Sequence, residues 1–469
     1  MSVDPVTVTA LALAEATGGQ LVGGDGGSVI GGVSIDSRTI APGDLFFAIR
    51  GERFDGHAFV AGAFERGAMG AVVSDAAAVA SPPANAVIVV VADTTQALQA
   101  LARHVRDASK AKVVAITGST GKTTTKEVTA EFLSSRYRVF RNKGNLNNHI
   151  GLPLSLLELR SRPDVAVVEL GMNHAGEIRT LVGIAQPDVR VWTNSGDAHI
   201  GFFASADAIA DAKAEILETS DETAVVVANA DDDRVMTRAK WFPGRVVTFG
   251  IDREADVRAV DIDERGAEGT SARVLTPSGE TAIDTPLPGR GNLANILAAT
   301  AVALELGVSL SDIASRASAL TPPPRRGQLV RLAGGVTIID DSYNSSPAAL
   351  KGALRTLART SGSARRAAVL GEMLELGEHA ERLHRECGAA AVEADLAWLI
   401  TVGGEPARAL GDAAVEAGLP AASLHHAATR DEAAEIAAGL ARPGDLVLIK
   451  GSRGIGVDRV TDRLGVEFG

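Results

Sequence analysis

Short runs of apolar residues, rich in β-branched side chains, recur along the chain and constrain its fold more than any other feature. The runs do not alternate with polar residues, and they cover 113–116, 165–168, 225–227, 338–339, 368–370 and 447–449. Such runs are typical of strands buried on both faces, as in a parallel sheet covered by helices. Alanine-rich helical stretches lie between them, for example at 206–218 and 292–306. The sequence therefore predicts an α/β fold.

Chain length and two breaks in the pattern predict the domain organisation. With roughly 100–200 residues per domain, 469 residues suggest three domains. A polar stretch at 106–110 precedes the run at 113–116, and the segment 321–327 contains three consecutive prolines. Three prolines cannot continue a helix and favour an extended connector. We therefore expect domains at 1–108, 109–322 and 323–469.

Charge and cysteine content exclude some classes of function. Lys plus Arg is 46 and Asp plus Glu is 58, which gives a net charge of −12. A net acidic chain is a poor candidate for sequence-independent nucleic-acid binding, but it can bind phosphates through a local site. The single cysteine, Cys387, excludes an intrachain disulfide. With no long apolar segment and no basic residues before the first apolar ones, we expect no membrane span, no secretory signal and a cytoplasmic location.

The run at 113–116 leads into a glycine-rich turn that is typical of a phosphate site. The turn and the helix start after it read Gly118-Ser119-Thr120-Gly121-Lys122-Thr123-Thr124. Glycines let backbone N–H groups turn toward a phosphate, and a helix N-terminus adds favourable partial charge. Lys122 can neutralise β- and γ-phosphates, and the Thr123 hydroxyl can ligate Mg²⁺. Ile116 stands where the strict motif has glycine, so the loop is a shortened variant; the alternative is an ordinary glycine-rich strand–helix turn.

Three further residues are candidates for a metal site, each with a plain structural alternative. Glu169 ends the run at 165–168, at a strand end of the kind where open α/β sheets bind ligands, but it could equally be a solvated acid. His199 follows a second strand-like run at 189–194. A lone loop histidine is more often structural than a ligand. On the predicted helix from 206, Lys213 shares an apolar stripe with Ile209, Ile216 and Leu217, and snorkelling of its amine to solvent is the alternative.

Electrostatics decides what Lys213 could do if it faced a metal–phosphate centre. Two unit positive charges about 4 Å apart repel by roughly 4 kcal/mol at an effective dielectric of about 20, and a divalent ion doubles that repulsion. An ammonium is therefore a poor neighbour for Mg²⁺. Conversion of the amine to a carbamate would invert its charge and turn Lys213 into a metal ligand.

Segments along nearly the whole chain resemble the signature motifs of one protein family. The first segments that carry the resemblance are Asp36-Ser37-Arg38-Thr39, residues 42–51, Phe54-Asp55-Gly56-His57, Gly144-Asn145-Leu146-Asn147-Asn148-His149-Ile150-Gly151 and Glu169-Leu170-Gly171-Met172-Asn173-His174. The later ones are Ala212-Lys213-Ala214-Glu215-Ile216, Gly289-Arg290-Gly291-Asn292-Leu293-Ala294-Asn295, Arg325-Arg326-Gly327-Gln328, Asp340-Asp341-Ser342-Tyr343-Asn344, Leu370-Gly371-Glu372-Met373 and Lys450-Gly451-Ser452-Arg453-Gly454. This spaced set resembles the Mur ligase family. Together the set is specific, although no single member is.

The resemblance implies a three-domain architecture with a UDP-sugar domain, a central P-loop ATPase-like domain and a Rossmann-like C-terminal domain that contacts nucleotide and incoming dipeptide. It also implies an ATP-dependent, ADP-forming acid–D-amino-acid ligase that uses Mg²⁺ and a carbamylated lysine at Lys213. Its implied catalytic residues are Lys122, Glu169, His199 and Lys213, and its implied metal ligands are Thr123, Glu169, His199 and Lys213. Its implied nucleotide residues are 118–124, Asn292, Arg326 and Asp341, with Arg325 as the weaker alternative to Arg326. Its implied substrate residues are Ser37, Arg38, Phe47, Gly51, His57, Asn148, Tyr343 and Asn344.

The substrates follow from which member of the family the chain resembles. The diaminopimelate-adding member carries an Asp-Asn-Pro-Arg motif in its last domain, and none occurs here after Pro324. The resemblance therefore favours addition of D-alanyl-D-alanine to UDP-N-acetylmuramoyl tripeptide during synthesis of peptidoglycan precursors, by a monomer. The alternatives are another Mur ligase, a folylpolyglutamate synthase, which would lack the UDP-sugar domain, or a non-catalytic nucleotide-binding module.

Overall fold

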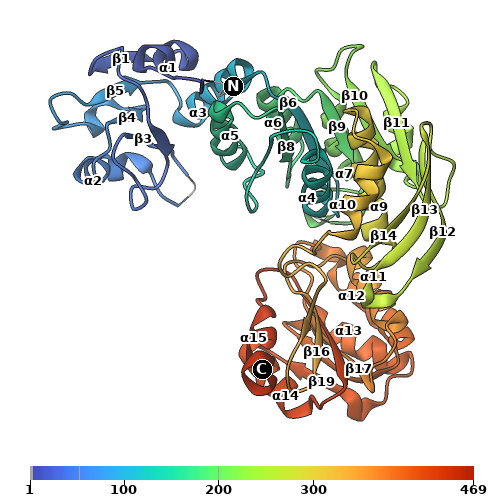
Figure 1. Cartoon of the computed structure of the whole chain (residues 1–469). Coiled ribbons are helices and arrows are strands. Elements are labelled where there is room, and N and C mark those ends of the chain that lie inside the picture. Colours follow the sequence, from blue (N-terminus) through green and yellow to red (C-terminus); the bar gives the residue numbers. More distant parts are fainter. Residues whose placement is uncertain (1–3, 52, 199) are drawn as a thin grey trace. The chain divides into compact units, whose positions relative to one another are not determined.

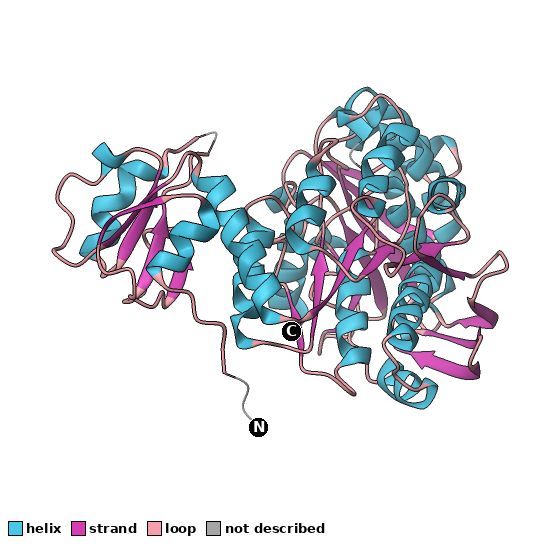
Figure 2. Ribbon diagram, turned by 90° about the horizontal axis from the view of Figure 1, so that it is seen from above, coloured by secondary structure: helices cyan, strands magenta, loops and turns pink. Residues whose placement is uncertain are grey.

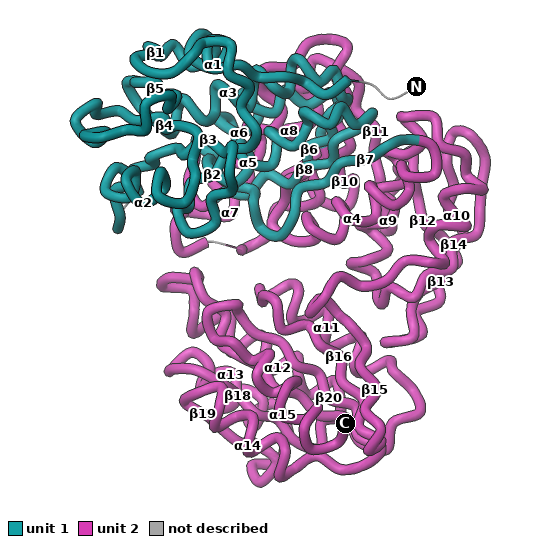
Figure 3. Tube along the Cα trace, turned by 60° about the vertical axis from the view of Figure 1, so that its left-hand side comes forward, with its two compact units in different colours: residues 1–115, 137–172, 176–190 teal, residues 116–136, 173–175, 191–469 magenta. Residues whose placement is uncertain are grey.

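The structure is a computed structural model that describes residues 4–51, 53–198 and 200–469. The chain divides into two compact units (Figure 3). Unit 1 comprises Met1–Ala115, Tyr137–Met172 and Gly176–Arg190, and unit 2 comprises Ile116–Arg136, Asn173–Ala175 and Val191–Gly469. The boundary predicted after residue 322 falls inside unit 2, where contacts cross it: the Ala267 N–H donates to Thr360 Oγ1 at 2.9 Å.

The N-terminal part of unit 1 is a mostly parallel sheet with flanking helices. Its strand order is β1 (Gln20–Gly23), β5 (Val87–Val90), β4 (Gly70–Val73), β3 (Asp44–Phe47), β2 (Gly32–Ser34), and β1 alone is antiparallel to its neighbour among these pairs. The helices are α1 (Ala10–Thr17), α2 (Val60–Glu65) and α3 (Thr94–Ser109). Asp93 begins α3, because its Oδ1 accepts from the N–H groups of Thr95 and Gln96.

A second sheet contains the predicted phosphate strand. Its order is β14 (Gly279–Thr285), β13 (Thr270–Thr276), β12 (Val257–Glu264), β11 (Arg245–Gly250), β10 (Val225–Asn229), β9 (Val189–Trp192), β6 (Lys112–Thr117), β8 (Val165–Glu169), β7 (Val139–Arg141). The pairs β7–β8, β10–β11 and β11–β12 are parallel, and β12–β13 and β13–β14 are antiparallel. The helices along this stretch of chain are α4 (Lys122–Leu133), α5 (Gly151–Leu156), α6 (Glu177–Ala185), α7 (Ala206–Ala214), α8 (Asp233–Ala239), α9 (Gly289–Glu305) and α10 (Leu310–Ser318) (Figure 1).

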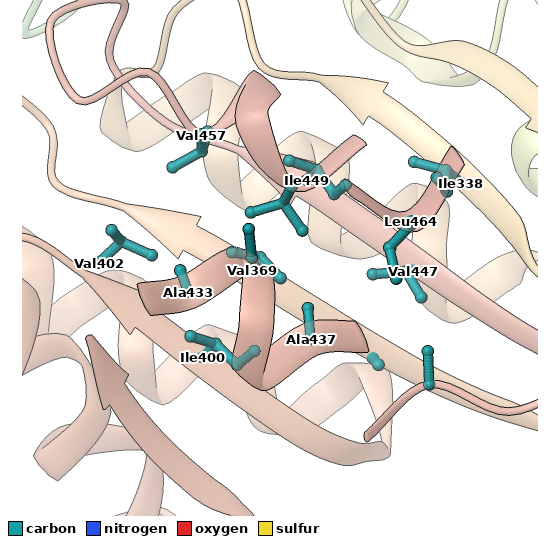
Figure 4. Close-up of a cluster of buried hydrophobic side chains, with 14 of the residues drawn as sticks. Ile338, Val369, Ile400, Val402, Ala433, Ala437, Val447, Ile449, Val457 and Leu464 are labelled. Atoms are coloured by element: carbon teal, nitrogen blue, oxygen red, sulfur yellow. The ribbon is translucent and has the colours of Figure 1, made fainter. Parts of the chain in front are cut away.

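The third sheet forms the C-terminal part of unit 2. Its order is β15 (Gln328–Arg331), β16 (Thr337–Asp341), β20 (Asp445–Lys450), β17 (Arg365–Gly371), β18 (Leu396–Val402), β19 (Leu424–Ala427), parallel except for β15. The accompanying helices are α11 (Pro347–Arg359), α12 (Ala380–Ala391), α13 (Glu405–Glu416), α14 (Arg430–Leu440) and α15 (Asp458–Phe468). Strand residues such as Val369, Ile400 and Ile449 pack with Ala437 of α14 and Leu464 of α15 in a fully buried core (Figure 4).

The predicted α/β class is confirmed, with strands and helices intermixed along the chain (Figure 2). Each predicted run lies in a strand: β6, β8, β10, β16, β17 and β20. The helix predicted from 206 consists of α7 followed by a 3₁₀ turn, Glu215–Leu217, and the one predicted from 292 is α9. Among the described residues, no helix is both long and apolar enough to cross a bilayer.

Candidate active site

The predicted phosphate loop joins β6 to α4, and its two glycines have positive φ. Gly118 has φ 150° and Gly121, which begins α4, has φ 82°. A Cβ at Gly118 would lie 1.9 Å from Thr193 Oγ1, and one at Gly121 would lie 2.2 Å from Asn295 Oδ1. Both positions therefore require glycine, for conformation and for space.

Neighbouring side chains hold this loop in shape. The Thr120 N–H donates to Asn194 Oδ1 at 2.9 Å, and Thr193 Oγ1 donates to the Thr120 carbonyl at 2.7 Å. Ser119 Oγ donates to the Gly196 carbonyl at 3.0 Å. The loop is thus preformed by the segment 193–196, which follows β9. Neither Thr193 nor Asn194 was predicted from the sequence, because their role depends on where the end of β9 lies in the folded sheet.

Lys122 folds back over the loop that precedes it. Its Nζ donates to the Gly118 carbonyl at 2.8 Å, and its charge acts on a second lysine, Lys213. Thr123, the next residue, is half-buried in the first turn of α4. The two lysines predicted to serve one phosphate site therefore interact electrostatically inside unit 2.

Lys213 is buried and lies on α7. The Ser205 hydroxyl begins this helix by accepting from the Ala208 N–H, and Ile209 and Lys213 are buried one turn apart, with 0% and 1% exposure. Snorkelling to solvent is thus excluded for the lysine. Burial, and secondly the nearby Lys122, hold the pKa of the Lys213 amine well below its ordinary value of 10.5. Within the part of the chain that the structure describes, this amine forms no hydrogen bond or ion pair. His199 lies outside the described residues.

Asn295 of α9 lies beside Gly121 of the phosphate loop, and Asn292 lies in the first turn of α9. Asn295 Oδ1 accepts from Thr125 Oγ1 at 3.2 Å, and Asn295 Nδ2 donates to Asn292 Oδ1 at 3.4 Å. Asn292 Nδ2 donates to the Pro288 carbonyl at 2.8 Å. Asn292 was the predicted nucleotide residue, and Asn295, which packs against Gly121, was missed although the quoted motif contains it.

Glu169 ends β8 in unit 1 and is 4% exposed. Its Oε1 accepts from Asn147 Nδ2 at 2.7 Å, and its N–H donates to Asn142 Oδ1 at 3.1 Å. Gly171 makes room for this arrangement, because a Cβ there would lie 2.9 Å from the Asn147 side chain. The Asn147 amide therefore fixes the orientation of this buried carboxyl group. Asn147 is a positioning residue that the sequence analysis did not single out.

The predicted sugar residues of the N-terminal sheet divide into exposed and internal ones. Arg38 is exposed and pairs with Asp36 at 2.7 Å, and its guanidinium lowers the pKa of that carboxyl to about 2. Ser37 is half-buried beside it, whereas Phe47 is fully buried in β3. The Phe47 side chain therefore supports the domain core and offers no surface to a sugar.

Three further predicted substrate residues form hydrogen bonds with backbone groups of unit 1. His57 Nδ1 lies 2.6 Å from Asp55 Oδ1, and its Nε2 accepts from the Ser74 N–H at 2.9 Å, so both ring nitrogens are occupied within the domain. The Gly51 N–H donates to the Phe54 carbonyl at 2.9 Å. Asn148 is exposed, and its Oδ1 accepts from the Gly151 N–H at 2.8 Å at the start of α5.

The predicted residues of the C-terminal sheet gather at the carboxyl ends of β16 and β20. The Arg326 guanidinium lies over the Tyr343 ring at 4.0 Å, and Arg453 lies 5.7 Å from the same ring. Arg325, the weaker alternative, instead pairs with Asp458 at 2.7 Å. Asp341 Oδ2 accepts from Lys450 Nζ at 2.6 Å.

These features define what the site can do. Unit 2 combines a rigid glycine loop suited to a polyphosphate with a buried amine whose depressed pKa favours its neutral, nucleophilic form. No group of three or more His, Cys, Asp or Glu side chains suited to a metal occurs among the described residues. A metal site built from the predicted set would therefore depend on Thr123 and on a modified Lys213 as well as on carboxylates.

Known proteins resemble this chain over almost its full length. Residues 29–106 match the model described as Mur ligase family, catalytic domain, residues 116–303 match the Mur ligase middle domain, and residues 325–453 match the Mur ligase glutamate ligase domain. The UDP-N-acetylmuramoyl-tripeptide–D-alanyl-D-alanine ligase of Bacillus subtilis is 35% identical over 93% of both chains. The ligase of the same name from Escherichia coli is 36% identical over 85% of this chain and 86% of its own.

Solved structures of MurF ligases also resemble this chain over almost its full length. A crystal structure of MurF from Acinetobacter baumannii matches with a TM-score of 0.89 and 33% identity, over 99% of this chain and 100% of that one. MurF ligase from Thermotoga maritima in complex with ADP matches with a TM-score of 0.81 and 30% identity, over 93% and 97%. A folylpolyglutamate synthase from Mycobacterium tuberculosis has a TM-score of 0.61 at 17% identity, over 79% and 93%, which shows a shared fold.

Proposed function

The chain belongs to the Mur ligase family, and from this premise we propose that it adds D-alanyl-D-alanine to UDP-N-acetylmuramoyl tripeptide in the synthesis of peptidoglycan precursors. The enzyme is an ATP-dependent amide ligase. The observation that carries the chemistry is Lys213, a buried amine without a protein partner among the described residues, whose pKa is lowered in part by the phosphate-loop residue Lys122.

The reaction needs activation, because a free carboxylate has no usable leaving group. The carboxylate of the tripeptide attacks the γ-phosphorus of ATP, and the bond to the bridging oxygen breaks to release ADP. The dipeptide amine then attacks the acyl carbon, the tetrahedral intermediate loses phosphate, and the amine proton passes to solvent or a base. The protein contributes positioning and charge neutralisation. Lys122 faces the triphosphate in this scheme, and the segment 193–196 keeps the loop in its binding shape.

Lys213 fits conversion to a carbamate. A neutral amine attacks the carbon of CO₂ and loses a proton, which leaves a carboxylate-like anion on Nζ. The low pKa and the lack of a partner among the described residues both favour this step. Thr123, Glu169, His199 and the Lys213 carbamate would hold Mg²⁺, which would supply neutralisation of phosphate charge. The buried Glu169 carboxylate, held by Asn147, suits that role.

The remaining assignments rest on the family resemblance. Residues 118–124, Asn292, Arg326 and Asp341 contact the nucleotide. Tyr343 and Asn344, with Ser37, Arg38, Gly51 and Asn148, form the environment of the other substrates. Phe47 and His57 contribute to it by supporting the backbone around these residues. Matches at 29–106, 116–303 and 325–453 support domains at 1–108, 109–322 and 323–469. The enzyme acts as a cytoplasmic monomer.

A phosphate-release assay tests the function. Purified protein receives ATP, Mg²⁺ and UDP-N-acetylmuramoyl tripeptide, together with single amino acids or dipeptides. Release that depends on D-alanyl-D-alanine is the expected result, and mass spectrometry identifies the pentapeptide product. Release with diaminopimelate would indicate another Mur ligase, release with a folate and glutamate would indicate a folylpolyglutamate synthase, and nucleotide binding without release would indicate a non-catalytic module.

A further inference from the structure

Lys450 is another buried lysine, at the last position of β20. Its side chain is 3% exposed, and it lies in the C-terminal sheet rather than beside the phosphate loop. In the parallel ladder it is the register partner of Asp341, the last residue of β16. The two strand ends therefore place a cation and an anion side by side at the carboxyl edge of the sheet, where α/β proteins bind ligands.

The Lys450 amino group bonds to both ends of the segment 341–344. Nζ donates to Asp341 Oδ2 at 2.6 Å and to the Asn344 carbonyl at 3.0 Å. Asp341 is 23% exposed, and no hydrogen bond from the described residues reaches its Oδ1. One carboxylate oxygen is thus fixed by the lysine, and the other remains available to a ligand.

The segment that Lys450 fixes also carries an aromatic platform. Tyr343 lies between the two Lys450 acceptors in sequence, and its N–H donates to the Arg325 carbonyl at 3.1 Å. The Arg326 guanidinium lies over its ring at 4.0 Å. A shift of the chain between Asp341 and Asn344 would therefore move the carboxylate, the ring and the guanidinium together.

We propose that Lys450 is a positioning residue for the nucleotide, acting by orienting Asp341 and the Tyr343–Arg326 stack. The inference rests on the proposed function, in which Asp341 and Arg326 contact ATP. Lys450 does not itself touch the substrate, because two of its three donors are used within the protein and its side chain is buried.

A matched control lies at the opposite end of the same strand. Asp445, the first residue of β20, is 1% exposed and pairs with Arg365 through bonds of 2.8 and 2.7 Å. The pair Arg365–Asp445 also joins a buried side chain to a partly exposed one of opposite charge, but it lies at the amino edge of the sheet. Breaking either pair removes the ion-pair partner of a carboxylate, so both changes destabilise the domain. The inference predicts that breakage of the Lys450 pair alone weakens nucleotide binding.

The experiment compares Lys450→Met with Arg365→Met. ADP binding in the presence of Mg²⁺ is measured by calorimetry, KM values for ATP and D-alanyl-D-alanine by phosphate release, and unfolding by urea. We expect Lys450→Met to weaken ADP binding by about tenfold or more, with the dipeptide KM within about twofold of wild type. Arg365→Met should unfold at lower urea but bind ADP like wild type. Unchanged ADP affinity in Lys450→Met, equal weakening in both variants, or a larger effect on the dipeptide would overturn the inference.

A double variant keeps the test decisive if Lys450→Met does not fold. Lys450→Met combined with Asp341→Asn removes both charges, so no unpaired carboxylate remains. This protein should bind ADP as weakly as Asp341→Asn alone, and wild-type affinity in it would refute the role of Lys450. The proposed function is judged separately, by dipeptide ligation in the wild type, so its failure would be distinguishable.

Discussion

Two of the buried lysines of unit 2, Lys213 and Lys450, differ in their bonding partners. Lys450 is 3% exposed and is satisfied by a carboxylate and a backbone carbonyl, whereas Lys213 is 1% exposed and has no such partner among the described residues. The fold can therefore supply hydrogen-bond partners to a buried lysine, as it does at Lys450. Leaving an amine unsatisfied costs stability, so its retention at Lys213 is explained by chemistry rather than by packing.

The two lysines also differ in the charged groups near them. Desolvation, and then the charge of Lys122, lower the pKa of Lys213, which favours the neutral amine that can react with CO₂. Lys450 instead pairs with the Asp341 carboxylate at 2.6 Å. In the proposed function Lys213 is the group that reacts, whereas Lys450 holds neighbouring groups in place. Three experiments test this contrast.

The largest effect should come from Lys213→Ala. We expect turnover to fall by at least about 10³-fold, because a preorganised charge next to the reacting phosphoryl group is lost. Short carboxylates such as formate or acetate should restore part of the activity by replacing the carbamate. Phosphate release measures both effects, with Lys240→Ala, which removes an exposed lysine, as the control. Wild-type turnover in Lys213→Ala would end the carbamate role.

The next effect concerns the free energy of unfolding. Substitution of Lys450 should lower it, whereas substitution of Lys213 should leave it unchanged or raise it. Lys450→Met leaves Asp341 unpaired and should lower the free energy of unfolding by about 3 kcal/mol. Lys213→Met exchanges an unpartnered amine for an apolar side chain of similar length, so it should leave that free energy unchanged or raise it. Urea denaturation in CO₂-free buffer measures both. A loss of stability in Lys213→Met as large as that in Lys450→Met would mean that Lys213 is structurally satisfied.

The smallest effect is a pH dependence that only Lys213 should produce. Its pKa in the folded chain is below the ordinary 10.5, so between these two values the unfolded chain binds more protons. The free energy of unfolding therefore rises with pH across that window, by up to about 1.4 kcal/mol per pH unit, and levels off above it. In CO₂-free buffer, subtracting the curve of Lys213→Met from that of wild type should isolate this slope. Parallel curves would contradict the lowered pKa.

Local sequence patterns predicted those elements whose structure depends on residues that are neighbours in the sequence. Runs buried on both faces identified β6 and β8, and the glycine turn before Lys122 located the phosphate loop. The strands β12, β13 and β14 were missed because they alternate buried and exposed residues and pair in antiparallel fashion, whereas the analysis relied on continuous apolar runs.

What was missed in the site depends on contacts between distant segments. The apolar stripe placed Lys213 on the inner face of a helix, but periodicity does not report depth, and only the fold distinguishes burial from snorkelling. Phe47 was expected at a ligand surface and is internal. Asn194 and Lys450 act through partners far away in sequence, and no local pattern predicts such pairs.

The packing of Gly121 against Asn295 also bears on how the protein is made. Thr125 and Asn295, which bond to each other beside that glycine, are 170 residues apart, so the loop lacks one wall until α9 has been synthesised. At about 5–20 residues per second, a ribosome needs on the order of 10–30 s to translate that interval. The loop of a nascent chain therefore lacks this contact for that time, and its final packing forms only after α9 has been made.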